Sequence, residues 1–199
     1  AHVSWKALAE SAANYALKDE YDRTILARIA AAQTDAAFIY GVDHATNSID
    51  MGFASGEIKP LSIINRLKRL LDEQNVPSDQ RWLVADPIFY EVLGESDSAL
   101  TNFDWVKGGN GTINNGRMTD GNAYGFTMYM SNNAAPATTA GVFQVVAGHK
   151  SAVATANTLN KTEEIRSEDF FGDKIRGMHL YGSKTLRQNS LVKSYYRVD

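Results

Sequence analysis

The stretch SWKALAESAANYALKDEYDRTILARIAAA, residues 4–32, is the part of the sequence around which the rest of the chain must be arranged. It contains no Gly and no Pro, and it is dominated by Ala, Leu, Glu, Lys and Arg, which favour helices. Ser4 is a residue type that caps helix N-termini. A helix over these residues would be roughly 40 Å long, enough to cross a small domain. The sequence therefore predicts one long helix.

The apolar residues of this helix do not form one straight stripe. Leu8 and Tyr15 share one side, whereas Tyr21, Ile25 and Ile29 drift round to another. This pattern is typical of a helix that changes partners along its length, and it differs from the seam of a coiled coil. We interpret the segment as a long packing helix that acts as a strut.

Length and composition exclude several classes of protein. The chain has 199 residues, of which 44% are hydrophobic and 22% charged, with a net charge of −3. This suits one large or two small globular domains and gives no sign of binding nucleic acid or an anionic membrane through bulk charge. The chain has no Cys, which excludes disulfides, thiol catalysis and cysteine metal sites. No apolar run approaches the ~20 residues of a membrane span.

Further helices and strands are predicted along the chain. The periodicity and turn signals indicate a helix over residues 60–75, a strand over 81–85, a short helix over 88–93 capped by Asp86, a hairpin over 112–118, and strands over 125–131 and 142–147. Residues 151–159 fit either a strand or a helix, and we favour a strand. Residues 175–186 alternate apolar and polar types and include two glycines, which fits either a pair of strands or one long bulged strand.

Motifs that would carry catalysis or ligand binding are weak. His2, His44, His149 and His179 lie far apart, and none has a second ligand at helical spacing to suggest a metal pair. The segment 108–111, Gly-Gly-Asn-Gly, lacks the Gly-Lys-Ser/Thr ending of a phosphate-binding loop and is better explained as a mobile surface loop. No Ser lies in a Gly-x-Ser-x-Gly elbow.

Two acidic pairs, Glu163-Glu164 and Glu168-Asp169, invite interpretation as a carboxylate pair or a divalent-metal site. Basic residues surround them, namely Lys161, Arg166, Lys174 and Arg176, so a solvated charged face explains them better. We therefore predict no catalytic, cofactor-binding or metal-binding residue.

An ordered set of weak motifs runs from about residue 57 to residue 192. It comprises Asn75-Val76-Pro77, Arg81-Trp82-Leu83-Val84-Ala85-Asp86-Pro87, Phe89-Tyr90-x-x-Leu93, Ile113-Asn114-Asn115-Gly116, Gly125-Phe126-x-Met128-Tyr129-x-Ser131-Asn132, Ala147-Gly148-His149-Lys150-Ser151-Ala152, Glu164-x-Arg166-x-Glu168-x-Phe170 and Ile175-Arg176-Gly177-x-x-Leu180-Tyr181-Gly182-x-Lys184-x-Leu186-Arg187. In this order the set resembles the major capsid protein of short-tailed double-stranded DNA bacteriophages and their marine relatives.

The resemblance implies an α+β subunit with the Hong Kong ninety-seven-like coat fold. Residues 1–57 and 147–199 would form the peripheral domain, in which the long helix Ser4–Ala32 is the spine and packs on strands from residues 151–187. Residues 58–146 would form the axial domain, whose loops meet around fivefold and sixfold axes.

One departure from the family concerns the start of the chain. Family members carry an N-terminal arm and an extended β-hairpin loop before the spine helix, and neither has a counterpart here. The chain also begins without Met, so we expect it to be the C-terminal part of a longer coat protein. Some family members crosslink a Lys to an Asn, but no motif places such a pair here and none is predicted.

The implied function is that of a structural, non-enzymatic subunit of an icosahedral bacteriophage head. Copies of the chain would assemble into pentamers and hexamers, forming a shell that encloses double-stranded DNA without sequence-specific binding and without a membrane. Scaffolding, portal and decoration proteins are further candidate partners. The expected location is the virion, after assembly in the host bacterial cytoplasm.

Four residues are candidate contacts between subunits, namely Trp105, Tyr124, Arg176 and Arg187, because aromatic side chains and Arg are enriched at interface hot spots. Ordinary core aromatics and surface charges explain them equally well. Two other functions stay open, another phage structural component such as a decoration or scaffolding protein, or a hydrolase or transferase whose site is assembled from scattered acidic residues and histidines.

Overall fold

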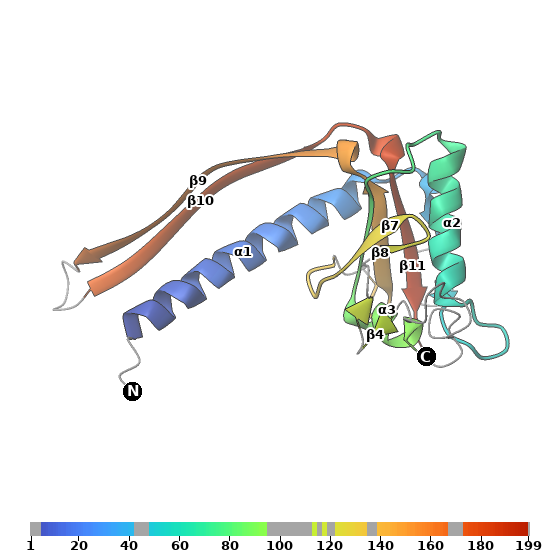
Figure 1. The fold of residues 1–199 in the computed structure, drawn as a ribbon, viewed down its shortest axis with the longest axis horizontal. Helices are drawn as coiled ribbons and strands as arrows, with labels where there is room; N and C mark the ends of the chain where they lie inside the picture. The colour runs from blue at the N-terminus through green and yellow to red at the C-terminus, as the bar shows by residue number, and fades with distance from the viewer. Residues whose placement is uncertain are drawn as a thin grey trace.

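The computed structural model describes residues 5–41, 48–94, 113–114, 117–118, 122–134, 139–166 and 173–198. Figure 1 shows two parts that meet at an angle. We call the long, thin part the arm; it consists of helix α1 (Trp5–Ala32) and the hairpin formed by β9 (Val153–Arg166) and β10 (Asp173–Thr185). We call the compact part the body.

A seven-stranded mixed sheet forms the centre of the body. Its strands lie in the order β1-β11-β8-β3-β7-β6, and β2 also pairs with β11. The bounds are Ile39–Tyr40 for β1, Ile49–Asp50 for β2, Arg81–Ala85 for β3, Asn122–Ala123 for β6, Phe126–Met130 for β7, Phe143–His149 for β8 and Leu191–Arg197 for β11. The remaining elements are α2 (Pro60–Glu73), α3 (Pro87–Leu93), the short hairpin of β4 (Ile113–Asn114) and β5 (Arg117–Met118), and three 3-10 turns, η1 (Ala36–Phe38), η3 (Lys150–Ala152) and η4 (Gln188–Ser190).

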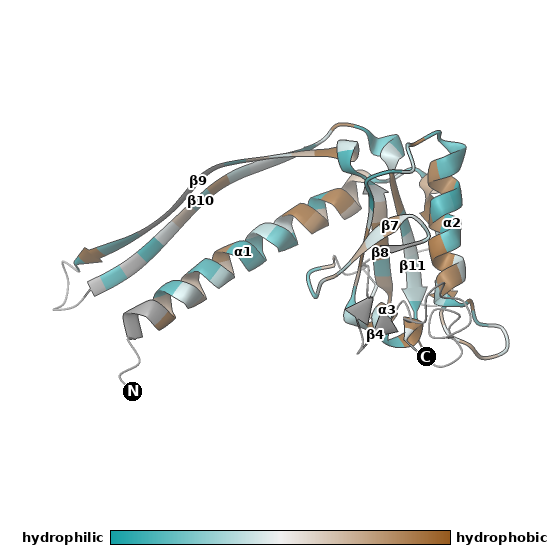
Figure 2. Ribbon diagram, in the orientation of Figure 1, coloured by the Kyte–Doolittle hydropathy of each residue, from teal (hydrophilic) through white to brown (hydrophobic). Residues whose placement is uncertain are grey.

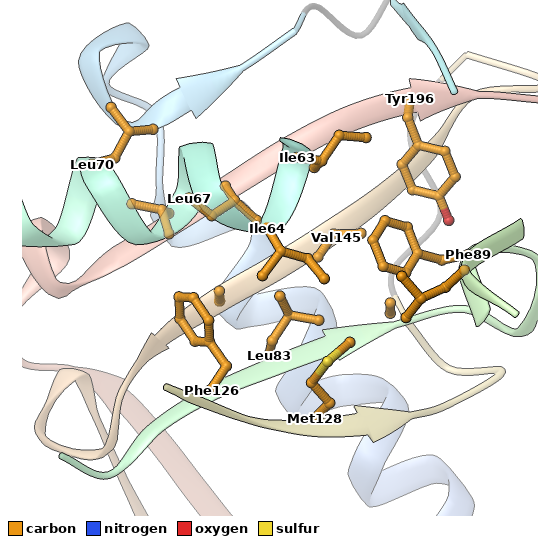
Figure 3. Close-up of a cluster of buried hydrophobic side chains, with 14 of the residues drawn as sticks. Ile63, Ile64, Leu67, Leu70, Leu83, Phe89, Phe126, Met128, Val145 and Tyr196 are labelled. Atoms are coloured by element: carbon orange, nitrogen blue, oxygen red, sulfur yellow. The ribbon is translucent and has the colours of Figure 1, made fainter. Parts of the chain in front are cut away.

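The main core lies between α2 and the sheet. Ile63, Ile64, Leu67 and Leu71 are fully buried on one face of α2, as its 3.6-residue periodicity predicts. Figure 3 shows Ile63, Ile64 and Leu67 directed toward the sheet side chains, including Leu83, Phe126, Val145 and Tyr196. Full burial of each such aliphatic side chain contributes roughly 1.5–3 kcal/mol, so this face of α2 holds the helix on the sheet.

Most elements predicted from the sequence are confirmed. The long helix, the amphipathic helix, the short helix capped by Asp86 and strands β3, β7 and β8 lie where they were expected, and β4 pairs with β5 as a hairpin. Ser4 lies outside the described residues. Residues 175–185 belong to one strand, β10, with a register shift between Leu180 and Tyr181, so the interpretation as a pair of strands is wrong and the bulged long strand is correct.

One central strand was not predicted at all. Strand β11 lies inside the sheet, next to its edge strands β1 and β2, antiparallel to β8 on one side and parallel to β1 on the other. It comes from the segment assigned to the peripheral domain, and the predicted boundary between residues 146 and 147 falls inside β8. The two-domain division stays a prediction, but the strands from both sides of its boundary share one sheet.

Candidate interaction surfaces

The arm joins the body through a second, smaller core, which we call the elbow. Ile29 and Ala30 in the last turns of α1 are buried against Val146, Ala152 and Leu191. The hairpin is tied at the same place, because the amides of residues 186 and 187 both donate to the carbonyl of Ala152. The helix and the hairpin therefore leave the body from one shared anchor.

Two buried polar side chains complete the elbow. The Nζ of Lys193, in β11, donates to the carbonyl of Ala30 at 3.1 Å and so satisfies a carbonyl at the C-terminal end of α1. The Nε2 of Gln33 donates to the carbonyls of Gln188 at 3.0 Å and Leu191 at 2.5 Å, while its Oε1 accepts from the amide of Asp35 at 3.1 Å. Gln33 is fully buried, so these bonds fix where the chain turns out of the helix.

Within the arm, α1 packs on one face of β10. The ring of Tyr21 lies 4.8 Å from the ring of Tyr181 in an edge-to-face arrangement and 5.1 Å from that of His179. The guanidinium of Arg28 donates to the hydroxyl of Ser183 at 3.1 Å. These partners alternate along β10, so its odd-numbered residues face the helix. The prediction that the long helix packs on strands from residues 151–187 is confirmed.

The even-numbered residues of β10 lie on the opposite, outward face of the hairpin. Met178 and Leu180 are 55% and 59% exposed there. Lys174, Arg176 and Lys184 are also exposed on this face, so it is both apolar and basic. Monomeric proteins rarely leave such a strip in water along a whole element, and the strip is therefore a candidate contact surface.

The outward face of α1, opposite its contact with β10, also carries exposed apolar side chains. Leu8 is 63% exposed and Tyr15 is 73% exposed. Figure 2 shows that the hydrophobic colouring of α1 gathers at the elbow, while its middle is largely hydrophilic. On the same outward face, the side chain of Asn133 in the body donates to the carboxylate of Asp19 at 2.6 Å.

The four predicted contact residues lie in different settings. Arg176 is on the outward face of the hairpin, where its guanidinium pairs with Glu163 of β9 at 2.9 Å. Arg187 is exposed just before η4. Tyr124 is half-buried against the main core at a turn with φ 52°, and Trp105 lies outside the described residues. The structure brings none of the three described residues together, and their role at an interface stays a prediction.

The described residues contain no cluster of three or more side chains that could hold a metal ion. His149 accepts a hydrogen bond from the amide of Ser151, and His179 belongs to the aromatic contact within the arm. Glu163 pairs with Arg176 on the hairpin, in line with the charged-face interpretation. His2, His44, the glycine-rich segment 108–111 and the acidic pair at residues 168–169 lie outside the described residues.

The carboxyl of Asp86 has a raised pKa, and its surroundings give it a structural role. Burial raises the pKa of this carboxyl above its ordinary value, while the amide of Phe89, 3.4 Å away, opposes the shift. The carboxylate also accepts a hydrogen bond from the hydroxyl of Tyr196. An open pocket of about 390 Å³ lies beside it, lined by Asp86, Pro87, Ile88, Asn132, Ala134, Phe143 and Gln144. These contacts cap α3 and hold it on β11, and they supply no second reactive group.

The chain is similar to known proteins in structure. No protein-family model and no curated protein matches the sequence. A structure from Mycobacterium phage Che8 matches with a TM-score of 0.70 and 25% identity, over 94% of this chain and 61% of that one. The capsid structure of the cyanophage P-SCSP1u matches with a TM-score of 0.70, and the asymmetric unit of the bacteriophage PhiM1 mature capsid with 0.65.

Both of the latter structures are 18% identical to this chain and match all of it, over 67% and 66% of their own chains. The chain therefore spans about three fifths to two thirds of the length of the structures it matches. Because the matches cover nearly every residue, arm and body are shared together. In the part of the chain that is described, none of the helices is both long enough and apolar enough to cross a membrane.

Proposed function

We propose, from the Hong Kong ninety-seven-like coat fold that this chain shares with phage capsid structures, that it is a structural subunit of an icosahedral phage head. The α+β coat fold itself is confirmed by these matches. One observation carries the proposal, namely that an arm and a body joined at a single elbow match capsid subunits as a unit. The finding does not depend on any one motif.

The proposed mechanism is repetition of one subunit. Copies of the chain would form pentamers and hexamers, and many modest contacts between neighbouring copies would sum to a closed shell. The shell would enclose double-stranded DNA in the virion, and the net charge of −3 fits a container that does not hold its cargo tightly. Assembly in the host cytoplasm, with scaffolding, portal and decoration proteins as candidate partners, belongs to the same proposal.

The arm corresponds to the proposed peripheral domain and the body to the axial domain. We place β1, β2 and β11 with the axial part, because they share a sheet with β3, β7 and β8. Arg176 and Arg187, on the hairpin and at its base, and Tyr124 at the edge of the body stay candidate contacts between subunits, as does Trp105. A non-enzymatic role is supported by the structural use of Asp86 and of both described histidines.

The proposal is tested by electron microscopy and sedimentation of the full-length gene product. We expect closed shells, or rings of five and six subunits. A protein that stays monomeric at high concentration, with and without the other head proteins of its source, would contradict the proposal. Melting temperatures measured with metal ions and common metabolites provide a second test, because a specific ligand that raises the melting temperature would favour an enzyme instead.

A further inference from the structure

We propose that the turn at residues 131–134, directly after β7, is a strap that locks the angle between arm and body. We call this turn the strap. It is closed in this structure, because its residue Asn133 binds Asp19 in α1. Breaking this contact leaves the elbow as the hinge about which the arm can swing. The inference concerns the subunit by itself and does not depend on the proposed function.

The contact joins a loop of the body to the middle of α1. The Nδ2 of Asn133 donates to the carboxylate of Asp19 at 2.6 Å, and it lies 3.5 Å from the backbone carbonyl of the same residue. Asp19 and Tyr21 lie on opposite sides of the helix, because two residues turn a helix by about 200°. Since Tyr21 contacts the hairpin, α1 is held between the hairpin on one side and the strap on the other.

The turn that presents Asn133 is built by the body alone. The amide of Ser131 donates to the carbonyl of Ala85, at the end of β3, at 3.0 Å. The amide of Asn133 donates to the hydroxyl oxygen of Ser131 at 3.1 Å, and the amide of Ala134 donates to the carbonyl of Ser131 at 3.2 Å. These three bonds do not involve α1. The turn therefore keeps its shape when the arm is released, and Asn133 stays in place to bind Asp19 again.

Apolar packing holds α1 to the body at the elbow. Among the described residues, the two buried apolar clusters include no part of α1 before Ile25. Asp19 lies roughly 16 Å from Ala30 along the helix, at about 1.5 Å per residue. The hydrogen bond of the strap therefore acts far from the hinge, where even a weak contact resists rotation of the arm.

The two attachments differ in what their release exposes. Gln33 and Lys193 are buried at the elbow, so breaking their bonds leaves polar groups without partners inside the protein. The bond between Asn133 and Asp19 is exposed. Water satisfies both of these groups after release, so the strap opens at little cost in free energy. The strap is therefore the attachment that can open and close, while the elbow persists.

Release of the strap moves the arm by a measurable distance. Ala16 lies roughly 21 Å from Ala30 along α1, so a swing of about 15° about the elbow moves it by roughly 5 Å. Spin labels at Ala16→Cys and Asn65→Cys report this movement, because both positions are exposed and the chain has no natural cysteine. The distances are measured by electron paramagnetic resonance on the unassembled full-length protein, so the result does not depend on whether shells form.

The variant Asn133→Asp opens the strap, because it removes the donor and sets a second carboxylate against Asp19. We expect the distance distribution to broaden or shift by roughly 5 Å. The matched control is Asn132→Asp, which adds the same charge at the neighbouring exposed residue of the turn. This control should keep the parent distribution. Both variants should keep the melting temperature of the parent, because neither residue is buried.

A reciprocal exchange restores the contact. When Asn133→Asp is combined with Asp19→Asn, the amide lies on α1 and the carboxylate on the turn, so the same hydrogen bond forms in the opposite direction. We expect this double variant to return to the parent distribution. An unchanged distribution in Asn133→Asp, or a double variant as broad as the single one, would overturn the strap. Equal broadening in Asn132→Asp would overturn it too, because added charge and not the bond would then control the arm.

Discussion

A single buried guanidinium fixes how β3 follows α2. Arg81 is 2% exposed, and it donates to the carbonyl of Val76 at 2.6 Å and to that of Pro77 at 2.8 Å. Its Nη2 also lies 2.7 Å from the carboxylate of Asp72, near the end of α2. Replacing it would leave the buried carbonyl of Val76 without this donor and would remove the ion pair with Asp72.

We expect Arg81→Met to lower the free energy of unfolding by about 2–4 kcal/mol, as measured by chemical denaturation. Arg69→Met is the matched control, because Arg69 pairs with Glu73 on the exposed side of the same helix. This control should stay within about 0.5 kcal/mol of the parent. Equal effects from the two substitutions would show that burial of Arg81 is not what matters.

The carboxyl of Asp86 makes stability depend on pH. Its pKa in the folded protein is raised, chiefly by burial, so the folded state holds this proton more tightly than the unfolded chain does. The contribution of the group to stability is therefore complete below the unfolded pKa of about 3.9 and is lost as pH rises through the folded pKa. The substitution Asp86→Asn removes this ionisable group and with it this pH dependence of stability.

Denaturant unfolding of both proteins between pH about 4 and 7 measures this effect. We expect the stability of Asp86→Asn relative to the parent to improve as pH rises through the folded pKa of Asp86, and to level off above it. A difference that stays constant with pH, or that moves in the parent's favour, would contradict the assignment.

At the scale of elements, the arm is held together by few contacts, and the ring of Tyr21 is central among them. Aromatic pairs of this kind add about 0.5–1.5 kcal/mol beyond the area they bury. We expect Tyr21→Ala to destabilise the protein by about 2–4 kcal/mol. Faster hydrogen exchange should follow in β10 and α1 and not in the body sheet.

Tyr15→Ala is the control, because Tyr15 lies on the same helix and is 73% exposed. It should leave the stability of the free subunit within about 0.5 kcal/mol of the parent. If Tyr15→Ala instead loosened the hairpin as much as Tyr21→Ala, the assignment of the two faces of α1 would be wrong.

Two strand glycines differ in what an added methyl group would meet. A Cβ on Gly148 in β8 would come within 2.7 Å of Leu191 and 2.8 Å of the carbonyl of Ser190, whereas a Cβ on Gly182 in β10 would meet nothing within 4 Å. We expect Gly148→Ala to lower the melting temperature, because overpacking reduces the free energy of unfolding by about 1–3 kcal/mol. Gly182→Ala should be neutral or slightly stabilising, and the reverse order would refute the packing at the elbow.

The elements that the sequence predicted carry strong local signals. The two long helices have propensity or periodicity over many residues, and α3 has both a capping Asp and Pro87 at its start. Strand β11 gave no such signal, since its buried positions include Lys193 and Ser194. The Lys is buried because it bonds to the end of α1, a partner 163 positions away, which no local pattern records.

The candidate contact surface on the hairpin could not be predicted from the sequence, for a related reason. Alternation along β10 indicates a strand with two unlike faces, but it does not say which face meets α1. Met178 and Leu180 look like ordinary core residues in the pattern, and they are exposed because α1 covers the face with His179 and Tyr181.

At the scale of the whole molecule, the angle between arm and body depends on the elbow. We expect Lys193→Met to widen the distribution of distances between spin labels placed by Ala16→Cys and Asn65→Cys, because a carbonyl at the end of α1 loses its donor. Lys150→Met, at an exposed position beside the elbow, should leave the distribution unchanged. An unchanged distribution in Lys193→Met would assign control of the angle to the strap and the apolar contacts.

The position of β11 has a consequence for the order of events during synthesis. Its residues leave the ribosome after those of every other described strand of the sheet, yet the sheet needs them between β8 and β1. A nascent chain without β11 therefore lacks both the strand that joins β1 and β2 to the rest of the sheet and the Lys193 donor of the elbow. Such a chain therefore cannot fix the angle between arm and body until β11 has been synthesised.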